Sequence, residues 1–227
     1  MDPGIRFVLF MQGCSLRCKY CHNKDMYCIN GGKEYSPEQI INEVLKYKNY
    51  YNLSGGGLTV SGGEPTLQCG FLTELFSLAK SHNIHTCLDT SGHVDINTIN
   101  PVLDNTDLVL LDIKQMNKKK CIELTGKSPE KTLLLAQYLN ERNIPVWIRY
   151  VLVPTVTDDR IDLENLGRFL NILDNVENLE ILPYHTMGKF KWQELGLKYE
   201  LEGIREANED DVKRALNIIN SKRECIL

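Results

Sequence analysis

Six short apolar runs recur along the chain, separated by longer stretches in which apolar residues repeat at helical spacing. Short apolar runs bounded by turn residues are typical of buried strands, and the helical period indicates amphipathic helices. The predicted strands lie at residues 5–11, 58–61, 84–89, 108–113, 146–153 and 179–183. The predicted helices lie at about residues 37–50, 67–82, 94–103, 118–124, 128–143, 162–173 and 209–221. The first helix has a distinct start, because Ser36, Pro37 and Gln39 combine an N-cap, a first-turn proline and a capping box.

Strands that alternate with helices predict right-handed βαβ units and a parallel sheet, which is an α/β fold. Six such units are too few for a closed eight-stranded barrel. We therefore expect a partial, open (β/α)6 barrel of the TIM-like type. No internal repeat, linker or low-complexity segment interrupts the pattern, so residues 1–227 are expected to form a single domain, with a short apolar tail at 225–227.

Composition narrows the class of protein. The 227 residues are 42% hydrophobic and carry a net charge of −4, which gives no electrostatic case for binding nucleic acid or an anionic membrane. No apolar run approaches the roughly 20 residues that span a bilayer. The start, Met1-Asp2-Pro3-Gly4, does not resemble a signal peptide, so we expect a cytoplasmic protein with reduced thiols.

A compact cysteine motif follows the first strand. Cys14, Cys18 and Cys21 are spaced C-x3-C-x2-C, and no fourth cysteine continues the pattern, since Cys28 is seven residues further on. Thiolates bind soft metals and iron–sulfur clusters, and cluster ligands are often packed into one loop. Three thiolates suggest a four-iron cluster in which one iron stays open, held by a loop at residues 12–34.

Two other interpretations of the motif remain. A structural zinc site would need a fourth ligand, and His22 is the nearest candidate. Ordinary free cysteines in a loop are the second alternative. The remaining cysteines are scattered singly and are expected to be buried or idle thiols: Cys28, Cys69, Cys87, Cys121 and Cys225.

Polar residues lie at the ends of nearly all the predicted strands. In parallel barrels the catalytic groups collect at these carboxyl ends, and charged groups in apolar strands are costly unless they are paired or used. The cysteine loop ends the first strand. The later strand ends carry residues 61–65 (Ser-Gly-Gly-Glu-Pro), 89–92 (Asp-Thr-Ser-Gly), Asp112 with Lys114, Arg149 and His185. We expect these groups to converge on one rim.

The spacing of Cys14, Cys18 and Cys21 resembles that of the radical S-adenosylmethionine superfamily. The signature of that superfamily is CxxxCxxC with an aromatic residue before the last cysteine, here Tyr20. Ser61-Gly62-Gly63-Glu64 matches the GGE motif of that superfamily. Nearly the whole chain further resembles the pyruvate formate-lyase activating enzyme family. The matching segments lie at residues 3–6, 12–14, 20–23, 61–64, 85–90, 111–117, 146–150 and 182–185.

This resemblance implies an activity. In the family, a [4Fe-4S] cluster binds S-adenosylmethionine at its open iron and cleaves it by one electron to a 5′-deoxyadenosyl radical. The radical removes a hydrogen atom from a backbone glycine of pyruvate formate-lyase, a glycyl radical enzyme. The protein positions the reactants and excludes water, while the cofactors supply the difficult chemistry. The resemblance also implies a flavodoxin or similar reductant, and we expect a monomer.

The resemblance assigns roles residue by residue. Cys14, Cys18 and Cys21 would hold the cluster, and Lys114 or Arg149 could pair with the cofactor carboxylate. Glycines at the GGE motif let backbone approach the methionine end, and His185 could bond ribose or adenine. The remaining cofactor contacts implied are Tyr20, Asn23, Gly62, Gly63, Glu64 and Asp89. A monovalent cation, Na+ or K+, is implied at Asp89, Thr90, Leu110 (through its carbonyl) and Asp112.

The chain also departs from the family pattern. The family carries a further element before an Asp-Gly-Pro-Gly-Ile-Arg run, so we expect this N-terminal element to be truncated. Activases of other glycyl radical enzymes remain an alternative, although those with a ferredoxin-like insert have extra cysteines between the cluster motif and GGE, where only Cys28 lies here. A non-catalytic zinc-binding adaptor would explain the cysteines but leave the strand-end residues without a role.

Overall fold

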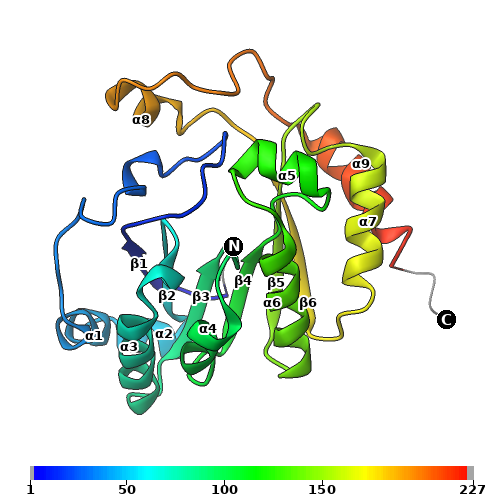
Figure 1. Cartoon of the computed structure of the whole chain (residues 1–227). Helices are drawn as coiled ribbons and strands as arrows, with labels where there is room; N and C mark the ends of the chain where they lie inside the picture. Colours follow the sequence, from blue (N-terminus) through cyan, green and yellow to red (C-terminus); the bar gives the residue numbers. More distant parts are fainter. Residues whose placement is uncertain (1–2, 224–227) are drawn as a thin grey trace.

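The computed structural model describes residues 3–223 and contains one six-stranded sheet in the order β1-β2-β3-β4-β5-β6 (Figure 1). Every neighbouring pair of strands is parallel. The strands are β1 (Arg6–Met11), β2 (Gly57–Gly62), β3 (His85–Thr90), β4 (Leu108–Asp112), β5 (Val146–Leu152) and β6 (Val176–Pro183). β1 and β6 are the two edges, so the barrel is open, and the predicted partial (β/α)6 fold is confirmed.

The helices are α1 (Pro37–Leu45), α2 (Lys48–Ser54), α3 (Cys69–Ser81), α4 (Ile96–Leu103), α5 (Lys118–Thr125), α6 (Glu130–Glu141), α7 (Arg160–Leu170), α8 (Lys189–Glu194) and α9 (Glu209–Asn220). Most of them cover the outer face of the sheet, whereas α8 lies above the sheet near the cysteine loop (Figure 1). Two short 3-10 helices, η1 (Lys24–Met26) and η2 (Pro65–Gln68), precede α1 and α3. The main apolar core packs the strands against residues such as Val44, Leu75, Leu139, Leu166 and Ala215 of these helices.

The local sequence explains where helices begin. The Ser36 side chain accepts from the backbone of Gln39, whose side chain accepts from Ser36 in return, so the predicted capping box is confirmed. A second capping box, formed by Asn208 and Asp211, starts α9. The segment predicted as one helix at 37–50 is instead two helices, and the second ends at Gly55, whose φ of 70° is easily reached only by glycine.

The prediction that the first strand is buried is wrong in one respect. β1 is an edge strand, and Val8 and Phe10 on it are 41% and 51% exposed. Alternation explains the difference, because these two side chains point toward the open interior of the barrel while their neighbours face α1 and α3. An apolar run therefore identified the strand but not the space it faces.

A second apolar cluster lies above the sheet, where the chain after β6 returns over the cysteine loop (Figure 1). Trp192 of α8, Tyr184 and Tyr199 pack there against Leu16 and Tyr20 of that loop. The pattern of apolar residues did not predict α8, because this helix has only 6 residues and a single buried one. The predicted apolar tail at 225–227 lies outside the described residues. Within residues 3–223, no helix is long and apolar enough to cross a membrane.

Candidate active site

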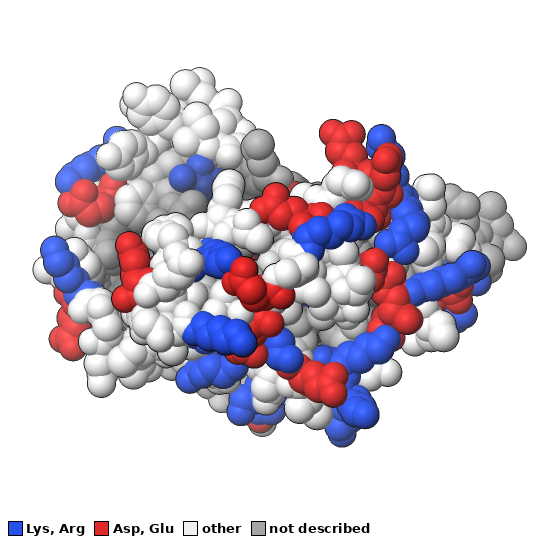
Figure 2. All heavy atoms as spheres, turned by 90° about the horizontal axis from the view of Figure 1, so that it is seen from above, with Lys and Arg blue, Asp and Glu red and all other residues white. Residues whose placement is uncertain are grey.

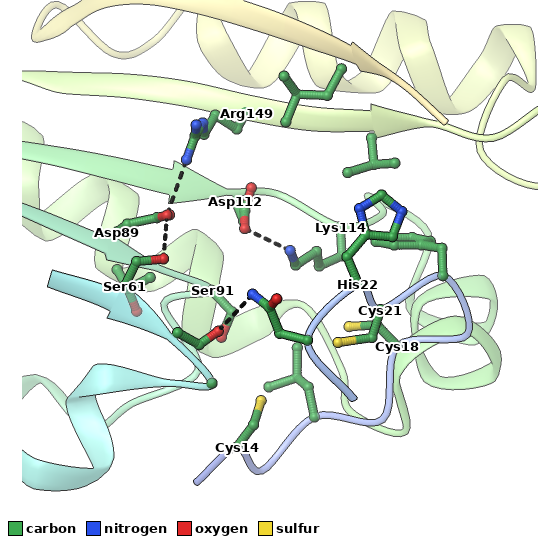
Figure 3. Close-up of a pocket in the computed structure, with 18 of the residues that line it drawn as sticks. Cys14, Cys18, Cys21, His22, Ser61, Asp89, Ser91, Asp112, Lys114 and Arg149 are labelled. Carbon is green, nitrogen blue, oxygen red and sulfur yellow. Dashed lines mark hydrogen bonds and ion pairs between the residues drawn. The ribbon is translucent and has the colours of Figure 1, made fainter. Parts of the chain in front are cut away.

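A cavity of about 620 Å³ opens at the carboxyl ends of the strands and is bounded by the cysteine loop. Figure 3 shows Cys14, Cys18 and Cys21 on one side of it and charged strand-end residues on the other. Figure 2 views the molecule from this side, and acidic and basic side chains are interspersed over the surface. The expectation that the cysteine loop and the polar strand-end residues converge on one rim is therefore confirmed. The lining includes Cys14, Cys18, Tyr20, Cys21, Asn23, Gly62, Gly63, Asp89, Thr90, Asp112, Lys114, Arg149 and His185.

The three cysteines lie on the wall of this cavity as free thiols. Burial raises the pKa of Cys14 to about 11 and that of Cys18 to about 12. Burial outweighs the attraction of the Lys114 ammonium, so the neutral thiol is favoured. Because iron binds the thiolate, loading of a cluster would release these protons and compensate the buried charge.

The thiols do not form a mononuclear metal site. Within residues 3–223, no three His, Cys, Asp or Glu side chains are close enough to hold one ion. A tetrahedral zinc with bonds of about 2.0–2.3 Å needs its ligand atoms within about 4 Å of one another. His22, the candidate fourth ligand, instead directs Nε2 to the carbonyl oxygen of His185 at 3.1 Å. With His22 engaged there, it is not directed at the thiols as a fourth zinc ligand, whereas three thiolates are sufficient for a cluster with one open iron.

The glycine-rich turn after β2 is packed directly against the cysteine loop. The backbone N–H of Gly63 donates to Met11, and that of Glu64 donates to the carbonyl of Gly13 at 2.6 Å. A Cβ at position 63 would lie 2.2 Å from the Gly13 carbonyl oxygen, and Gly62 has a φ of 119°. Position 63 therefore requires glycine because the two backbone segments approach closely, and position 62 requires glycine because of its backbone conformation.

Glu64 is buried below this turn, with 1% of its surface exposed. Its carboxylate accepts from the hydroxyls of Thr66 at 2.7 Å and Thr90 at 2.6 Å, and from both the backbone N–H and the hydroxyl of Ser91. A buried carboxylate is tolerated when its lone pairs are satisfied in this way. Glu64 therefore fixes the end of β2 to the end of β3 and faces protein, not the cavity.

Asp89 belongs to a charged network that crosses the sheet. Its carboxylate accepts from Ser61 at 2.7 Å and lies 3.1 Å from Nη1 of Arg149 (Figure 3). Nε of Arg149 is 3.2 Å from Glu180. Burial, followed by repulsion from Asp112, raises the pKa of Asp89 to about 6, although Arg149 acts in the opposite direction. Two carboxylates therefore compete for positive charge at this rim.

Asp112 and Lys114 form the second ion pair, with Nζ 2.6 Å from Oδ2. The pKa of Lys114 lies well above its ordinary value, because the attraction of Asp112 and other groups outweighs the cost of burial. Of the other two residues of the predicted cation site, Thr90 lines the cavity and Leu110 does not. The Thr90 hydroxyl donates to Glu64, and the Leu110 side chain is buried against Cys87 below the cavity.

His185 and Tyr20 each present a buried polar atom with no hydrogen-bond partner in the described part of the chain: Nδ1 of His185 and the Tyr20 hydroxyl. Buried polar atoms are normally satisfied, so an unpartnered pair lining one cavity suits a polar ligand. The His185 ring contacts the His22 ring in a tilted arrangement, with ring centroids 4.4 Å apart. Asn23 approaches the carbonyl of Gly62 at 3.5 Å.

Val8, Phe10 and His22 are among the lining residues that the sequence did not single out for the site. Val8 and Phe10 make the wall at β1 apolar, opposite the charged residues of β3 to β5. The available signal was that they share one face of the strand, but only the open edge of the sheet shows that this face lines the cavity. His22 adjoins the last cysteine, and its position is set by a contact with His185 that is distant in sequence.

Comparison with known proteins agrees with this geometry. The radical SAM superfamily profile matches residues 8–166. A pyruvate formate-lyase-activating enzyme of Listeria monocytogenes is 47% identical over 225 residues, covering 96% of this chain and 91% of the relative. A pyruvate formate-lyase-activating enzyme of Staphylococcus aureus is 48% identical, covering 97% of this chain and 90% of the relative.

Solved structures share the fold. A domain of pyruvate-formate lyase-activating enzyme from Bacteroides vulgatus matches with a TM-score of 0.62 and 24% identity, covering 74% of this chain and 94% of that one. Streptococcus suis SuiB bound to S-adenosylmethionine matches with a TM-score of 0.70 and 18% identity, covering 98% of this chain and 49% of that one.

An open parallel barrel with three cysteines at its mouth is the architecture of a radical SAM enzyme, and the family match covers most of the chain. Within that superfamily, the two relatives named above are 47% and 48% identical over nearly the whole chain, and this shows the family. The chain belongs to the pyruvate formate-lyase-activating enzyme family.

Proposed function

We propose that this chain activates pyruvate formate-lyase by generating its glycyl radical, with a [4Fe-4S] cluster and S-adenosylmethionine as cofactors. When bound, these cofactors supply a 5′-deoxyadenosyl radical through one-electron cleavage of the sulfonium. The observation that carries the proposal is the single cavity lined by three free cysteines, the glycine turn and two buried ion pairs. Activation of a different glycyl radical enzyme is the alternative.

The chain's own residues bind and orient the cofactors. Cys14, Cys18 and Cys21 would hold three irons. The glycine turn at Gly62 and Gly63 leaves room for backbone contacts to the methionine end, where Asn23 and Tyr20 also face the cavity. The set that binds S-adenosylmethionine is proposed to be Tyr20, Asn23, Gly62, Gly63, Asp89, Lys114, Arg149 and His185, with Glu64 fixing the turn.

Lys114 and Arg149 have the chemistry to bind the cofactor carboxylate, because a guanidinium can donate two parallel hydrogen bonds and an ammonium is a compact point charge. Both are already held in place by Asp112 and Asp89. Preorganised charges lose little entropy when the ligand arrives. The unpartnered Nδ1 of His185 would accept or donate a hydrogen bond at the ribose or adenine.

A monovalent cation would relieve the repulsion between the two carboxylates at the rim. Asp89 is paired with Arg149 and Asp112 with Lys114. Repulsion between Asp89 and Asp112 indicates uncompensated negative potential there. Na+ or K+ prefers oxygen ligands, and the side chains of Asp89, Thr90 and Asp112 with the Leu110 carbonyl would supply them.

The protein substrate is proposed to enter at the apolar side of the cavity. Val8 and Phe10 on the open edge of the barrel give an apolar surface against which a glycine-containing loop could pack. The electron would come from flavodoxin or a similar carrier, and we further propose that the chain acts as a cytoplasmic monomer.

One anaerobic experiment tests the function. The protein would be reconstituted with iron and sulfide, reduced, and mixed with S-adenosylmethionine and purified pyruvate formate-lyase. A glycyl radical doublet in the electron paramagnetic resonance spectrum, with 5′-deoxyadenosine as product, is the expected result. Deoxyadenosine without the doublet would redirect the proposal to another glycyl radical enzyme. A loaded cluster that yields neither product would overturn it.

A further inference from the structure

Four side chains form a continuous stack on the outside of the cysteine loop, away from the cavity. The guanidinium of Arg17 lies 4.6 Å from the centre of the Tyr27 ring. The ammonium of Lys24 lies 4.2 Å from the same ring and 3.9 Å from the ring of Trp192. All three distances fall within the roughly 6 Å over which a cation is attracted to an aromatic ring. We refer to Arg17, Tyr27, Lys24 and Trp192 as the cation–aromatic stack.

The stack also holds the backbone of the cluster-binding cysteines. Nη1 of Arg17 donates to the carbonyl of Cys14 at 2.7 Å, and Nε1 of Trp192 donates to that of Cys21 at 2.9 Å. The Tyr27 hydroxyl donates a longer bond to the carbonyl of Cys18, at 3.4 Å. Each of the three cysteines is therefore bonded from outside by a different member of the stack.

The stack is anchored in the folded protein. Trp192 is only 1% exposed and packs edge-on against Tyr199, with ring centroids 5.4 Å apart. The Tyr199 hydroxyl is 2.9 Å from that of Tyr184 in the same apolar cluster. The chain after β6 thus fixes one end of the stack, and the cysteine loop carries the other three members.

The two cations of the stack are not neutralised by a neighbouring carboxylate. Within residues 3–223, neither Arg17 nor Lys24 makes a salt bridge, and Asp25, which adjoins Lys24, pairs with Lys191 instead. Glu200 is near enough to act on Lys24 electrostatically without contacting it. Two positive charges without a salt-bridge partner among the described residues therefore belong to the group of side chains that contacts the backbone of the three cysteines.

We propose that the cation–aromatic stack is a positioning device that orients the three cysteine ligands and raises the reduction potential of the cluster they hold. The inference rests on the proposed function. Reduction adds one electron to an already negative cluster, and nearby positive charge favours the more negative form. The potential of such clusters responds to net charge and hydrogen bonding around them, which are the two quantities the stack supplies.

The test uses the reconstituted full-length protein and measures the cluster, not turnover. Lys24→Met removes one charge and keeps most of the bulk, and Lys24 bonds none of the cysteine carbonyls. We expect the equilibrium for one-electron reduction to fall about tenfold, a shift of about 59 mV to more negative potential, in a titration followed by electron paramagnetic resonance. Lys24→Arg keeps the charge and the stacking and should restore the parent midpoint.

Arg17→Met tests the second part of the proposal. It removes both a charge and the bond to Cys14, so it should shift the midpoint and also lower the iron retained after exposure to a chelator. The matched control is Lys19→Met in the same loop, because the Lys19 ammonium has no aromatic or carboxylate partner among the described residues. No aromatic ring holds its ammonium beside the cysteine backbone, so a clearly smaller shift is expected.

Three results would overturn the proposal: an unchanged midpoint in a fully loaded Lys24→Met protein, an equal shift in Lys19→Met, or failure of Lys24→Arg to restore the parent value. The proposed function fails separately, if the parent protein loads no four-iron cluster or cleaves no S-adenosylmethionine when reduced chemically with dithionite.

Discussion

Arg149 and Asp89 form an ion pair, 3.1 Å from Nη1 to Oδ2, although their strands are not neighbours in the sheet. β4 lies between β3 and β5, so the long side chain of Arg149 spans it. Its Nε reaches Glu180 on β6 at 3.2 Å. One guanidinium therefore joins the ends of three strands across the charged half of the cavity.

Replacement of Arg149 by methionine should destabilise the folded protein. Asp89 and Glu180 would lose a shared positive partner while still 15–18% exposed at their side chains. Leaving a largely buried charge unpaired costs about 3–5 kcal/mol, so we expect the free energy of unfolding in urea to fall by about 3 kcal/mol. Arg168→Met on the exposed surface of α7 is the control and should change it little.

Removal of one cluster ligand should abolish cluster binding. Cys18 is the most buried of the three motif cysteines. Among the described residues that line the cavity, the only other thiols are those of Cys14 and Cys21, so none is available to replace it. Cys18→Ala is expected to reduce bound iron and sulfide to background and to eliminate activity. Cys121→Ala is the control, because that cysteine is buried on α5 outside the cavity. An intact four-iron spectrum in Cys18→Ala would refute the assignment.

Asp112 links the proposed cation site to the cofactor site. Asp112→Ala removes the partner of Lys114 and one carboxylate ligand, so cleavage of S-adenosylmethionine should weaken about tenfold or more and lose its response to Na+ or K+. The measurement is the rate of 5′-deoxyadenosine formation at varied salt identity and constant ionic strength. If parent and variant respond identically to the two cations, the proposed site must be withdrawn.

His185 should act on cofactor affinity more than on the cluster. In His185→Ala the unpartnered Nδ1 and the ring that contacts His22 are both lost. A single hydrogen bond and an aromatic contact together contribute about 1–3 kcal/mol, so the apparent KM for S-adenosylmethionine should rise about tenfold or more. The iron content should stay at the parent value. Equal apparent affinity in the two proteins would remove His185 from the binding set.

The stability of the fold should depend on pH through Asp107. Burial disfavours its charge, but hydrogen bonds from Lys80 and the Thr86 backbone outweigh this and hold its pKa below the ordinary value. The carboxylate therefore stabilises the folded state above pH about 4, and this contribution is lost as pH falls through the lowered folded pKa.

Asp107→Asn should accordingly unfold more easily than the parent at pH 7, with a difference that shrinks as the pH falls below about 4. Urea unfolding at several pH values measures this. Asp174→Asn, in the exposed turn before β6, serves as the comparison. A difference that stays constant down to acid pH would show that the charge of Asp107 is not what stabilises the folded state.

The sequence by itself determined the strands, most of the helices and the residue types of the site. Alternating apolar runs and helical periods placed all six strands, and the number of units indicated an open barrel. Residue type and spacing were sufficient for the cysteine motif, the glycine turn and the polar strand ends, because parallel strands bring their carboxyl ends to one edge. The resemblance to a family then gave these residues their expected roles.

Only the tertiary structure decided which groups meet. Ion pairing of Asp89 with Arg149, and burial of Glu64 under Thr90 and Ser91, depend on the register of strands far apart in sequence. The exposure of Phe10 follows from β1 being an edge. The contact of Trp192 with Cys21 joins positions 171 residues apart. Local patterns fix the conformation of a segment, whereas such pairings depend on packing between segments, which no short stretch of sequence encodes.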